Sequence, residues 1–358
     1  MAIVKPVRGM AGRLVCFGVE TSCDETAAAV VSLEEGRPLI LGSVVASQAD
    51  RHAAYGGVVP ELATREHLRA LEWVAAEAMR SSCLAWADID LVAATRGPGL
   101  ASALMTGHCF GRAVAIAAGK PFLGTNHLEG HMVSAFLDGA APPMHGVGSW
   151  LALVVSGGHT LLAVGRADGT HEVIGSTLDD AAGEAFDKGA KMLGLGYPGG
   201  AALEAATRGG NPSAHRFPRG MLRSGDLAFS FSGLKTALRI YLGKEFGGSA
   251  PEGEALRDIC ASYQQAIVDV LVGKTAAALQ QTGLRVLVVA GGVACNAALR
   301  AALTELCGRD GIRLLAARPE HCTDNAAMIA LAGAWRHAGS GAVSPWDEDV
   351  VPGLGLTA

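Results

Sequence analysis

The fold is decided by the stretch LVCFGVETSCDETAAAVVSL at residues 14–33. Its two ends, residues 14–19 and 27–33, are short apolar runs that are rich in β-branched side chains. They flank the polar segment 20–26. This arrangement predicts two strands joined by an active loop.

The same pattern occurs twice more along the chain. Residues 151–155 and 160–164 are apolar runs on either side of the loop SGGH, and the glycine pair GG at 291–292 follows the strand-like residues 285–290. A helix is expected to start shortly after this pair, near Asn296. Three polar loops carried by strands indicate a duplicated nucleotide-binding architecture.

Apolar periodicity predicts helices at residues 61–79, 100–118, 126–136, 178–193, 234–242, 254–281 and 323–338. Strands that alternate with helices favour an α/β fold with a largely parallel sheet covered on both faces. The segment 209–226 is rich in Gly, Pro, Ser and Arg and is expected to form a mobile loop. We expect a flexible leader at residues 1–13, an N-terminal lobe at 14–150 and a C-terminal lobe at 151–338. The remaining residues, 339–358, are expected to form a tail whose last part could return to the N-terminal lobe.

Composition narrows the class of protein. The chain has 358 residues, 50% of them hydrophobic, and a formal net charge of −5. This charge argues against indiscriminate coating of nucleic acid but leaves room for a local basic face. Eight cysteines without a C-x-x-C motif indicate reduced thiols in a cytoplasmic protein. We find neither a signal peptide nor a membrane-spanning run of about 20 apolar residues.

His127 and His131 are four residues apart, which places two imidazoles on one face of a helix, as a metal site requires. Two unrelated histidines would show the same spacing. Glu129 does not directly follow the first histidine, so a zinc-protease mechanism is disfavoured. Asp324 is placed either to cap the following helix or to supply an anionic ligand. Two histidines and one carboxylate suit Fe(II) or Zn(II).

The glycine pairs offer backbone that a phosphate can approach closely, although either pair alone could be a simple turn. Asp24 and Glu25 would repel a phosphate unless a cation lay between them. Asp187 lies shortly before segment 197–200, which is expected to break the helix. Its carboxylate could therefore lie next to a loop and bind ribose hydroxyls.

A basic segment lies between residues 208 and 239, where Asp226 is the single acid. It could dock a structured RNA or remain a solvated loop. Its aromatic residues could stack on a base or pack in the core. The basic and aromatic residues are Arg208, Arg216, Arg219, Arg223, Lys235, Arg239, Phe217, Phe229 and Phe231.

Taken together, nine segments resemble the TsaD family of tRNA N6-adenosine threonylcarbamoyltransferases, once named O-sialoglycoprotein endopeptidases. The resemblance runs in order from about residue 14 to 338. It implies an actin-like, sugar-kinase-like (ASKHA) fold with two α/β lobes and a nucleotide cleft. The segments are ETSCDET (20–26), YGGVVPE (55–61), GPGL (97–100), NHLEGH (126–131), VSGGHT (155–160), residues 179–188, FSFSGLKT (229–236), AGGV (290–293) and CTDN (322–325).

The resemblance also implies roles for individual residues. His127, His131 and Asp324 are its metal ligands, with iron the usual metal and zinc the alternative. Asp24 and Glu25 match active-site acids, and either of them or His159 would accept the proton of the attacking amine. The positions that match the family's nucleotide-binding residues are Val154, Val155, Ser156, Gly157, Gly158, Asp187, Gly200 and Asn296, and Glu204 matches a position used in some members only. The glycine pair itself adds Gly291 and Gly292 as expected nucleotide-binding residues, and the basic segment supplies the expected tRNA contacts Arg216, Arg219 and Lys235.

The implied reaction moves the threonylcarbamoyl group of threonylcarbamoyl-AMP to N6 of the adenosine next to the anticodon, in tRNAs that read codons beginning with A, and releases AMP. The implied partners are tRNA, a paralogous inactive subunit, a small ATPase and a second copy of the chain. The alternative is an ATP-dependent, sugar-kinase-like phosphotransferase, which would not need two histidines. The tail at 346–349 is acidic where many members are basic, which argues against RNA contacts there.

Overall fold

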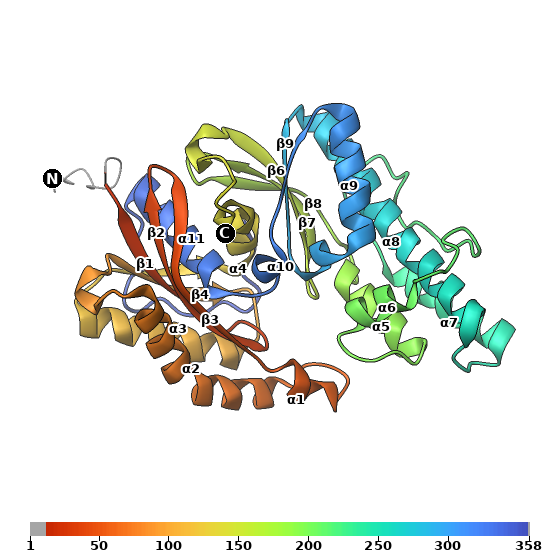
Figure 1. Ribbon diagram of the computed structural model, residues 1–358, viewed down its shortest axis with the longest axis horizontal. Coiled ribbons are helices and arrows are strands. Elements are labelled where there is room, and N and C mark those ends of the chain that lie inside the picture. The colour runs from red at the N-terminus through yellow and green to blue at the C-terminus, as the bar shows by residue number, and fades with distance from the viewer. Residues whose placement is uncertain (1–11, 357–358) are drawn as a thin grey trace.

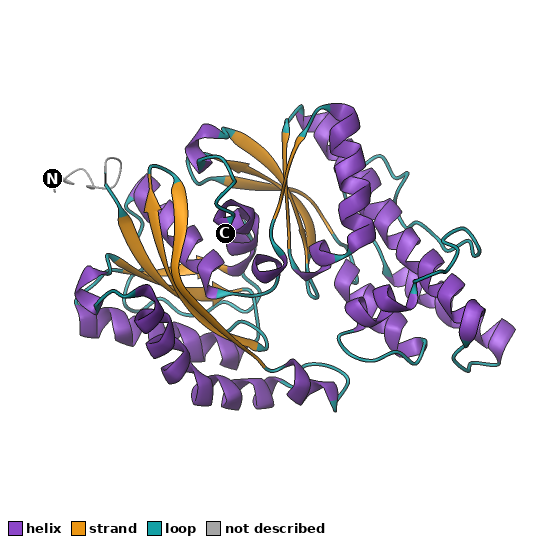
Figure 2. Ribbon diagram, viewed as in Figure 1, coloured by secondary structure: helices purple, strands orange, loops and turns teal. Residues whose placement is uncertain are grey.

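The computed structural model describes residues 12–356, which form two five-stranded sheets in separate lobes (Figures 1 and 2). In the first sheet the strand order is β3-β2-β1-β4-β5. Its strands are β1 (Leu14–Glu20), β2 (Glu25–Glu34), β3 (Arg37–Ser47), β4 (Leu91–Gly97) and β5 (Phe122–Asn126).

The second sheet repeats this topology with the order β10-β9-β6-β7-β8. In each sheet a three-stranded antiparallel meander continues into parallel strands, β1 beside β4 and β6 beside β9. The duplication predicted from the sequence is therefore present. The strands are β6 (Ser149–Val155), β7 (Thr160–Arg166), β8 (His171–Ser176), β9 (Val286–Ala290) and β10 (Arg313–Ala316).

The prediction of a largely parallel sheet was wrong, because both sheets are mixed. The third strand of each meander escaped the periodicity analysis, since β3 and β8 are half-exposed edge strands with few buried positions. Glu35 and Gly36 form the tight turn into β3, with φ of 49° and 71°. Positive φ at both central residues is typical of the hairpin turn whose twist matches its strands.

Helices form layers around the sheets (Figure 1). α2 and α3 cover one face of the first sheet, α4 and α11 lie on its other face, and α4 also contacts β6 and β9 of the second sheet. α8 and α9 pack beyond the second sheet. The helices are α1 (Ala49–Ala53), α2 (Pro60–Ser82), α3 (Ala101–Ala118), α4 (His127–Ser134), α5 (Ala182–Met192), α6 (Gly199–Ala206), α7 (Ser232–Phe246), α8 (Gly253–Thr282), α9 (Ala297–Asp310), α10 (Pro319–Cys322) and α11 (Ala326–Ser340).

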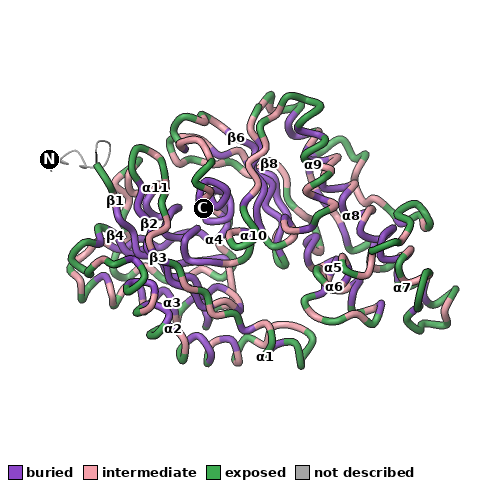
Figure 3. The backbone as a smooth tube through the Cα atoms, viewed as in Figure 1, coloured by how far each residue is buried: buried purple, intermediate pink, exposed green. Residues whose placement is uncertain are grey.

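α11 packs very closely on the first sheet. A Cβ added at Gly18 would lie 2.5 Å from the carbonyl oxygen of Ala326, and one at Gly333 would lie 2.7 Å from the Cβ of Ala93. Glycine at both positions therefore sets the distance between helix and sheet, because larger side chains would separate them. The continuous buried layer that results is visible in Figure 3.

Two predicted helices begin later than expected. The helix expected from residue 178 begins at Ala182, because Asp179 instead accepts hydrogen bonds from Ser230, Phe231 and Ser232 at the start of α7. The helix expected from residue 323 begins at Ala326, where the Asn325 side chain accepts from the backbone of the first turn. Asp324 is therefore not the cap, and its carboxylate is free to face the interior.

The segment 209–226 is turn-rich, but α8 holds it in place. Arg219 Nη2 lies 2.8 Å from the Asp269 carboxylate, and buried Lys274 donates to the carbonyl oxygen of Asp226 at 2.6 Å. This differs from the mobile loop expected from composition. Composition does not reveal the two charged anchors, because they lie about 50 residues away on another helix.

The C-terminal tail runs along the first lobe. Gly99 N donates to the carbonyl oxygen of Pro352, Asn126 Nδ2 donates to that of Gly355, and Glu348 pairs with Arg96 at 3.3 Å. The lobe bounds expected at residues 150, 338 and 339 stay predictions. Residues 1–11 of the expected leader lie outside the described part of the chain. Within residues 12–356 no helix is both long and apolar enough to span a bilayer.

Candidate active site

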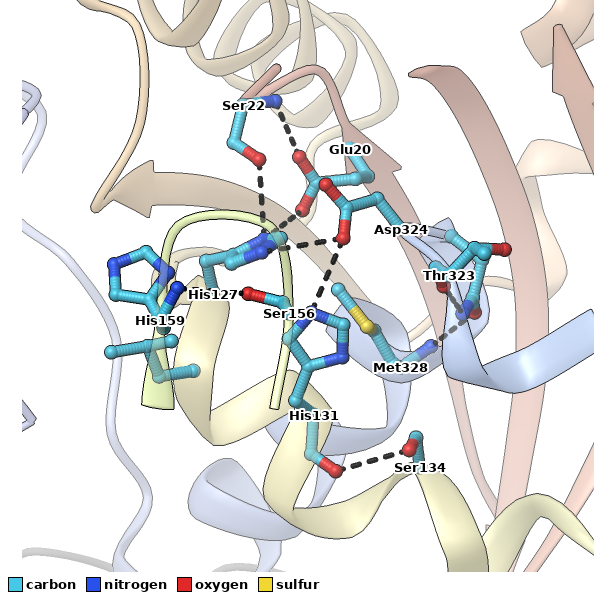
Figure 4. Close-up of polar contacts among 12 residues, drawn as sticks. Glu20, Ser22, His127, His131, Ser134, Ser156, His159, Thr323, Asp324 and Met328 are labelled. Atoms are coloured by element: carbon cyan, nitrogen blue, oxygen red, sulfur yellow. Dashed lines mark hydrogen bonds and ion pairs between the residues drawn. The ribbon is translucent and has the colours of Figure 1, made fainter. Parts of the chain in front are cut away.

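Three side chains converge where α4 and α11 meet (Figure 4). α4 begins directly after β5, and the Asn126 side chain accepts a hydrogen bond from its first turn, so His127 and His131 lie on successive turns. Asp324 Oδ1 lies 3.5 Å from His127 Nε2 and 3.2 Å from His131 Nε2. The predicted grouping of these three residues is therefore present in the fold.

The donor set suits a metal ion. One ligand atom from each residue lies within 4.8 Å of the other two. Both ring nitrogens of His131 are buried; Nε2 faces the Asp324 carboxylate at 3.2 Å, whereas Nδ1 has no partner within the described chain. Two imidazoles and one carboxylate are ligand types that divalent ions such as zinc and iron commonly take. The triad could hold a single divalent cation.

Glu20 orients the first of these histidines. Its Oε2 lies 3.0 Å from His127 Nδ1 and accepts a hydrogen bond from Thr95 Oγ1 at 2.6 Å. Ser22 Oγ lies 3.2 Å from the same imidazole nitrogen. With Nδ1 engaged in this way, Nε2 is directed toward Asp324, the arrangement that commonly fixes a ligating histidine.

No role for Glu20 or Thr95 is predicted from the sequence. They come together because β1, β4 and β5 are parallel neighbours, so that their carboxyl ends meet at one edge of the sheet. Polar residues at the carboxyl ends of neighbouring strands often form a binding site. This pattern could be used to find Glu20 and Thr95 only once the order of the strands in the sheet was known.

Charges within the triad are strongly coupled. Burial alone would lower the pKa of His127, but the carboxylates of Asp324 and Glu20 raise it to about 9. Burial would raise the pKa of Asp324, but His127 and His131 hold it below its ordinary value. Burial lowers the pKa of His131. The carboxylates of Asp324 and Glu20 therefore favour a positive charge at this point, which a bound cation would supply.

A cavity of about 470 Å³ opens beside the triad. Its walls come from the three predicted loops and from other segments noted in the sequence, including Glu184, Tyr197 and Thr323, for which no individual role was predicted. The predicted residues that line it are Asp24, Glu25, His127, Ser156, Gly157, Gly158, His159, Asp187, Gly292 and Asp324.

A second cavity of about 350 Å³ shares Gly157, Asp187 and Gly292 with the first. It is also lined by Gly200, Glu204 and Asn296. All the predicted nucleotide-binding residues except Val154, Val155 and Gly291 therefore line one or both of these cavities. Burial raises the pKa of Asp187, although the N–H groups of Gly199 and Gly200 donate to its carboxylate.

Some predicted residues lie elsewhere. Val154 and Val155 are fully buried in β6. Gly291 forms the turn after β9, with φ of 94° and its backbone against Val155. None of the three lines either cavity. One carboxylate oxygen of Glu204 already accepts a hydrogen bond from Ala297 N at 2.8 Å, within the protein itself.

The candidate proton acceptors have shifted pKa values. Burial, followed by the charges of Asp324 and Asp24, raises the pKa of Glu25 well above its ordinary value. Burial, followed by the nearby His127 and His131, lowers the pKa of His159 to about 4. At neutral pH His159 is therefore uncharged, and Glu25 is a stronger base than an exposed carboxylate.

The predicted tRNA contacts lie away from both cavities. Arg216 is exposed and Lys235 is half-buried, whereas Arg219 is already paired with Asp269. The core interpretation of the aromatic residues is confirmed, since they are all buried; these are Phe217, Phe229 and Phe231.

Fold and site together define a duplicated, two-lobed α/β protein of the actin-like, sugar-kinase-like class, with a cleft next to a candidate metal centre. The sequence model of the TsaD family, described as tRNA N6-adenosine threonylcarbamoyltransferase, matches residues 39–331. The chain belongs to this family.

Curated relatives and solved structures agree with this assignment. A tRNA N6-adenosine threonylcarbamoyltransferase from Geotalea uraniireducens is 48% identical, with 95% of this chain and 96% of the relative covered. One from Pelobacter propionicus is 51% identical, with 89% and 91% covered. HypF from T. kodakarensis aligns with a TM-score of 0.58 over 92% of this chain and 48% of its own, at 11% identity, which shows the shared fold alone.

Replacing His131 with alanine should remove most of the metal bound by the purified protein, because a two-ligand remnant binds far more weakly. The measurement is metal content per chain by inductively coupled plasma mass spectrometry. His145→Ala, at an exposed histidine outside the site, is the matched control and should keep full metal content. Equal metal in both variants would show that His131 is not a ligand.

Proposed function

We propose that this chain is a metal-dependent transferase that moves the threonylcarbamoyl group from threonylcarbamoyl-AMP to N6 of the adenosine next to the anticodon in tRNAs that read codons beginning with A. Family membership supports the reaction. The observation that carries the metal dependence is the triad of His127, His131 and Asp324, because two of its members line the wall of the larger cavity.

The chemistry of the acceptor explains why an activated donor is needed. The exocyclic amine of adenine is a poor nucleophile, because its lone pair is delocalised into the ring. A mixed anhydride with AMP makes the carbamoyl carbon electrophilic. The amine nitrogen attacks this carbon, the bond to the phosphate oxygen breaks, AMP leaves and the amine loses a proton.

Residues of the cleft are suited to these events. A Cβ added at Gly157 or Gly158 would meet no atom within 4 Å, so the backbone there is open to a phosphate. When bound, a divalent cation would supply Lewis-acid stabilisation of charge on phosphate and carbonyl oxygens. Glu25, with its raised pKa, or Asp24 or uncharged His159 would accept the amine proton.

The second cavity would hold the adenosine part of the donor. Asp187 and Gly200 lie on the side formed by α5 and α6, and Asn296 lies opposite at the start of α9. The Asn296 side chain is fixed by Gln264 at 2.7 Å and by Leu299 N at 3.0 Å, which gives this wall a defined shape. A rigid wall favours one ligand pose.

Other features remain part of this proposal. The reactive adenosine has to leave the stack of the anticodon loop to enter the cleft. Arg216 and Lys235 are the proposed tRNA contacts. A role for Arg219 would be indirect, through the loop that it anchors to Asp269. Iron as the metal, the paralogous and ATPase subunits, a homodimer and the cytoplasmic location stay predictions. Family membership does not favour the phosphotransferase alternative.

Replacing Gly157 with leucine should abolish the reaction without unfolding the protein, because the added side chain would extend into open cleft. We expect threonylcarbamoyladenosine to fall in tRNA from cells depleted of this chain, and to return with the native chain but not with this variant. Mass spectrometry of tRNA nucleosides measures both. Gly146→Leu, at a second unobstructed glycine outside the cavities, should restore the nucleoside. Unchanged nucleoside content after depletion would refute the proposed function.

Replacing Arg216 with alanine should weaken tRNA binding and reduce the slope of log affinity against log salt by about one, as expected for the loss of one phosphate contact. Filter binding over a salt series provides the measurement. Arg37→Ala, at an exposed arginine on the edge of the first lobe, should leave the slope unchanged. The same slope for Arg216→Ala and the native chain would exclude a phosphate contact at this position.

A further inference from the structure

Two cysteines meet at the nucleotide side of the cleft. Cys295 ends the 3-10 turn Gly292–Cys295 after β9, and Cys322 ends α10; these two elements contact each other. Cys295 is half-exposed and lines the second cavity, whereas Cys322 is fully buried. A thiol that solvent can reach therefore lies next to one that it cannot.

Arg300 on α9 ties the two segments together. Its Nε donates to the carbonyl oxygen of Ala294 at 2.5 Å, and its Nη2 donates to that of Ala317 at 2.6 Å. The same Nη2 lies 3.3 Å from Cys322 Sγ. The guanidinium thus holds the backbone on both sides and brings a positive charge to the thiol pair.

This arrangement activates one thiol. The neighbouring Cys322 thiol and, to a smaller extent, the Arg300 charge lower the pKa of Cys295 to about 7, against the opposing effect of burial. Burial instead raises the pKa of the thiols of Cys16, Cys23 and Cys260. A low-pKa, accessible cysteine beside a second cysteine is the typical arrangement of a reversible oxidation site.

We propose that Cys295 and Cys322 form such a site, which a peroxide converts into an intramolecular disulfide. The inference stands independently of the proposed function. The bond would join the loop after β9 to the segment that carries Asp324, and so would connect the walls of the cleft covalently.

The two steps balance. The Cys295 thiolate attacks one oxygen of hydrogen peroxide, the O–O bond breaks, and the released hydroxide takes up a proton to give water; the sulfur becomes a sulfenic acid. Cys322 Sγ then attacks that sulfur, an S–S bond forms, the S–O bond breaks, and the hydroxyl leaves as water with the thiol proton. Two thiols and one peroxide give one disulfide and two waters, and a dithiol reductant reverses the reaction.

The test is a disulfide map of the full chain after treatment with hydrogen peroxide at pH 7. Trypsin cleavage at Arg285, Arg300, Arg313 and Arg336 places the two cysteines on separate peptides, each with no other cysteine. We expect these peptides to be cross-linked, with the loss of two hydrogen atoms, and to separate after reduction. At pH 7 a larger fraction of Cys295 is thiolate than of an ordinary exposed cysteine, but each thiolate of lower pKa is a weaker nucleophile. The net effect should be that Cys295 reacts with hydrogen peroxide about threefold faster than an ordinary exposed thiol.

Variants separate the two steps. Cys322→Ser should stop at the sulfenic acid on Cys295, which a 1,3-diketone probe captures, and Cys295→Ser should give neither product. Cys109→Ser removes an exposed thiol and should retain the cross-link. The proposal is overturned if both cysteines stay reduced in the native chain while Cys109 is oxidised, or if Cys295 is found joined to any other cysteine.

Discussion

The convergence of two imidazoles and a carboxylate at the junction of α4 and α11 is the constraint on which the rest of the structure depends. These groups are costly to bury unless they are paired or bound to an ion. Glu20 and Thr95 hold His127 in place, and the Asp324 carboxylate faces Nε2 of both histidines. The grouping is suited to hold a single cation.

The duplicated fold places this junction beside the ligand space. α4 and α11 lie against the first sheet, and α4 also contacts the second, so that the candidate metal ligands lie between the loops of both lobes. Gly18 and Gly333 allow α11 to approach the sheet closely enough for Asp324 to reach the histidines on α4. The cleft, its acids and its open glycines then surround the same point, where a phosphoanhydride would need positive charge.

Much of this could be predicted from the sequence, because the signals were local. The spacing of His127 and His131 and the loop around Gly157 are visible in short segments. The role of Glu20 was not visible, since it depends on the order of β1, β4 and β5. Asp324 was ambiguous until Asn325 proved to be the cap of α11. The edge strands β3 and β8 were missed because half-exposed strands carry a weak apolar pattern.

The most direct test is X-ray diffraction from metal-loaded crystals, recorded on both sides of the iron and zinc absorption edges. We expect one anomalous peak per chain, bonded to Nε2 of His127, Nε2 of His131 and the carboxylate of Asp324, with Glu20 still hydrogen-bonded to His127. A chain with bound metal but no peak among these three residues, or with the metal held elsewhere, would contradict this expectation.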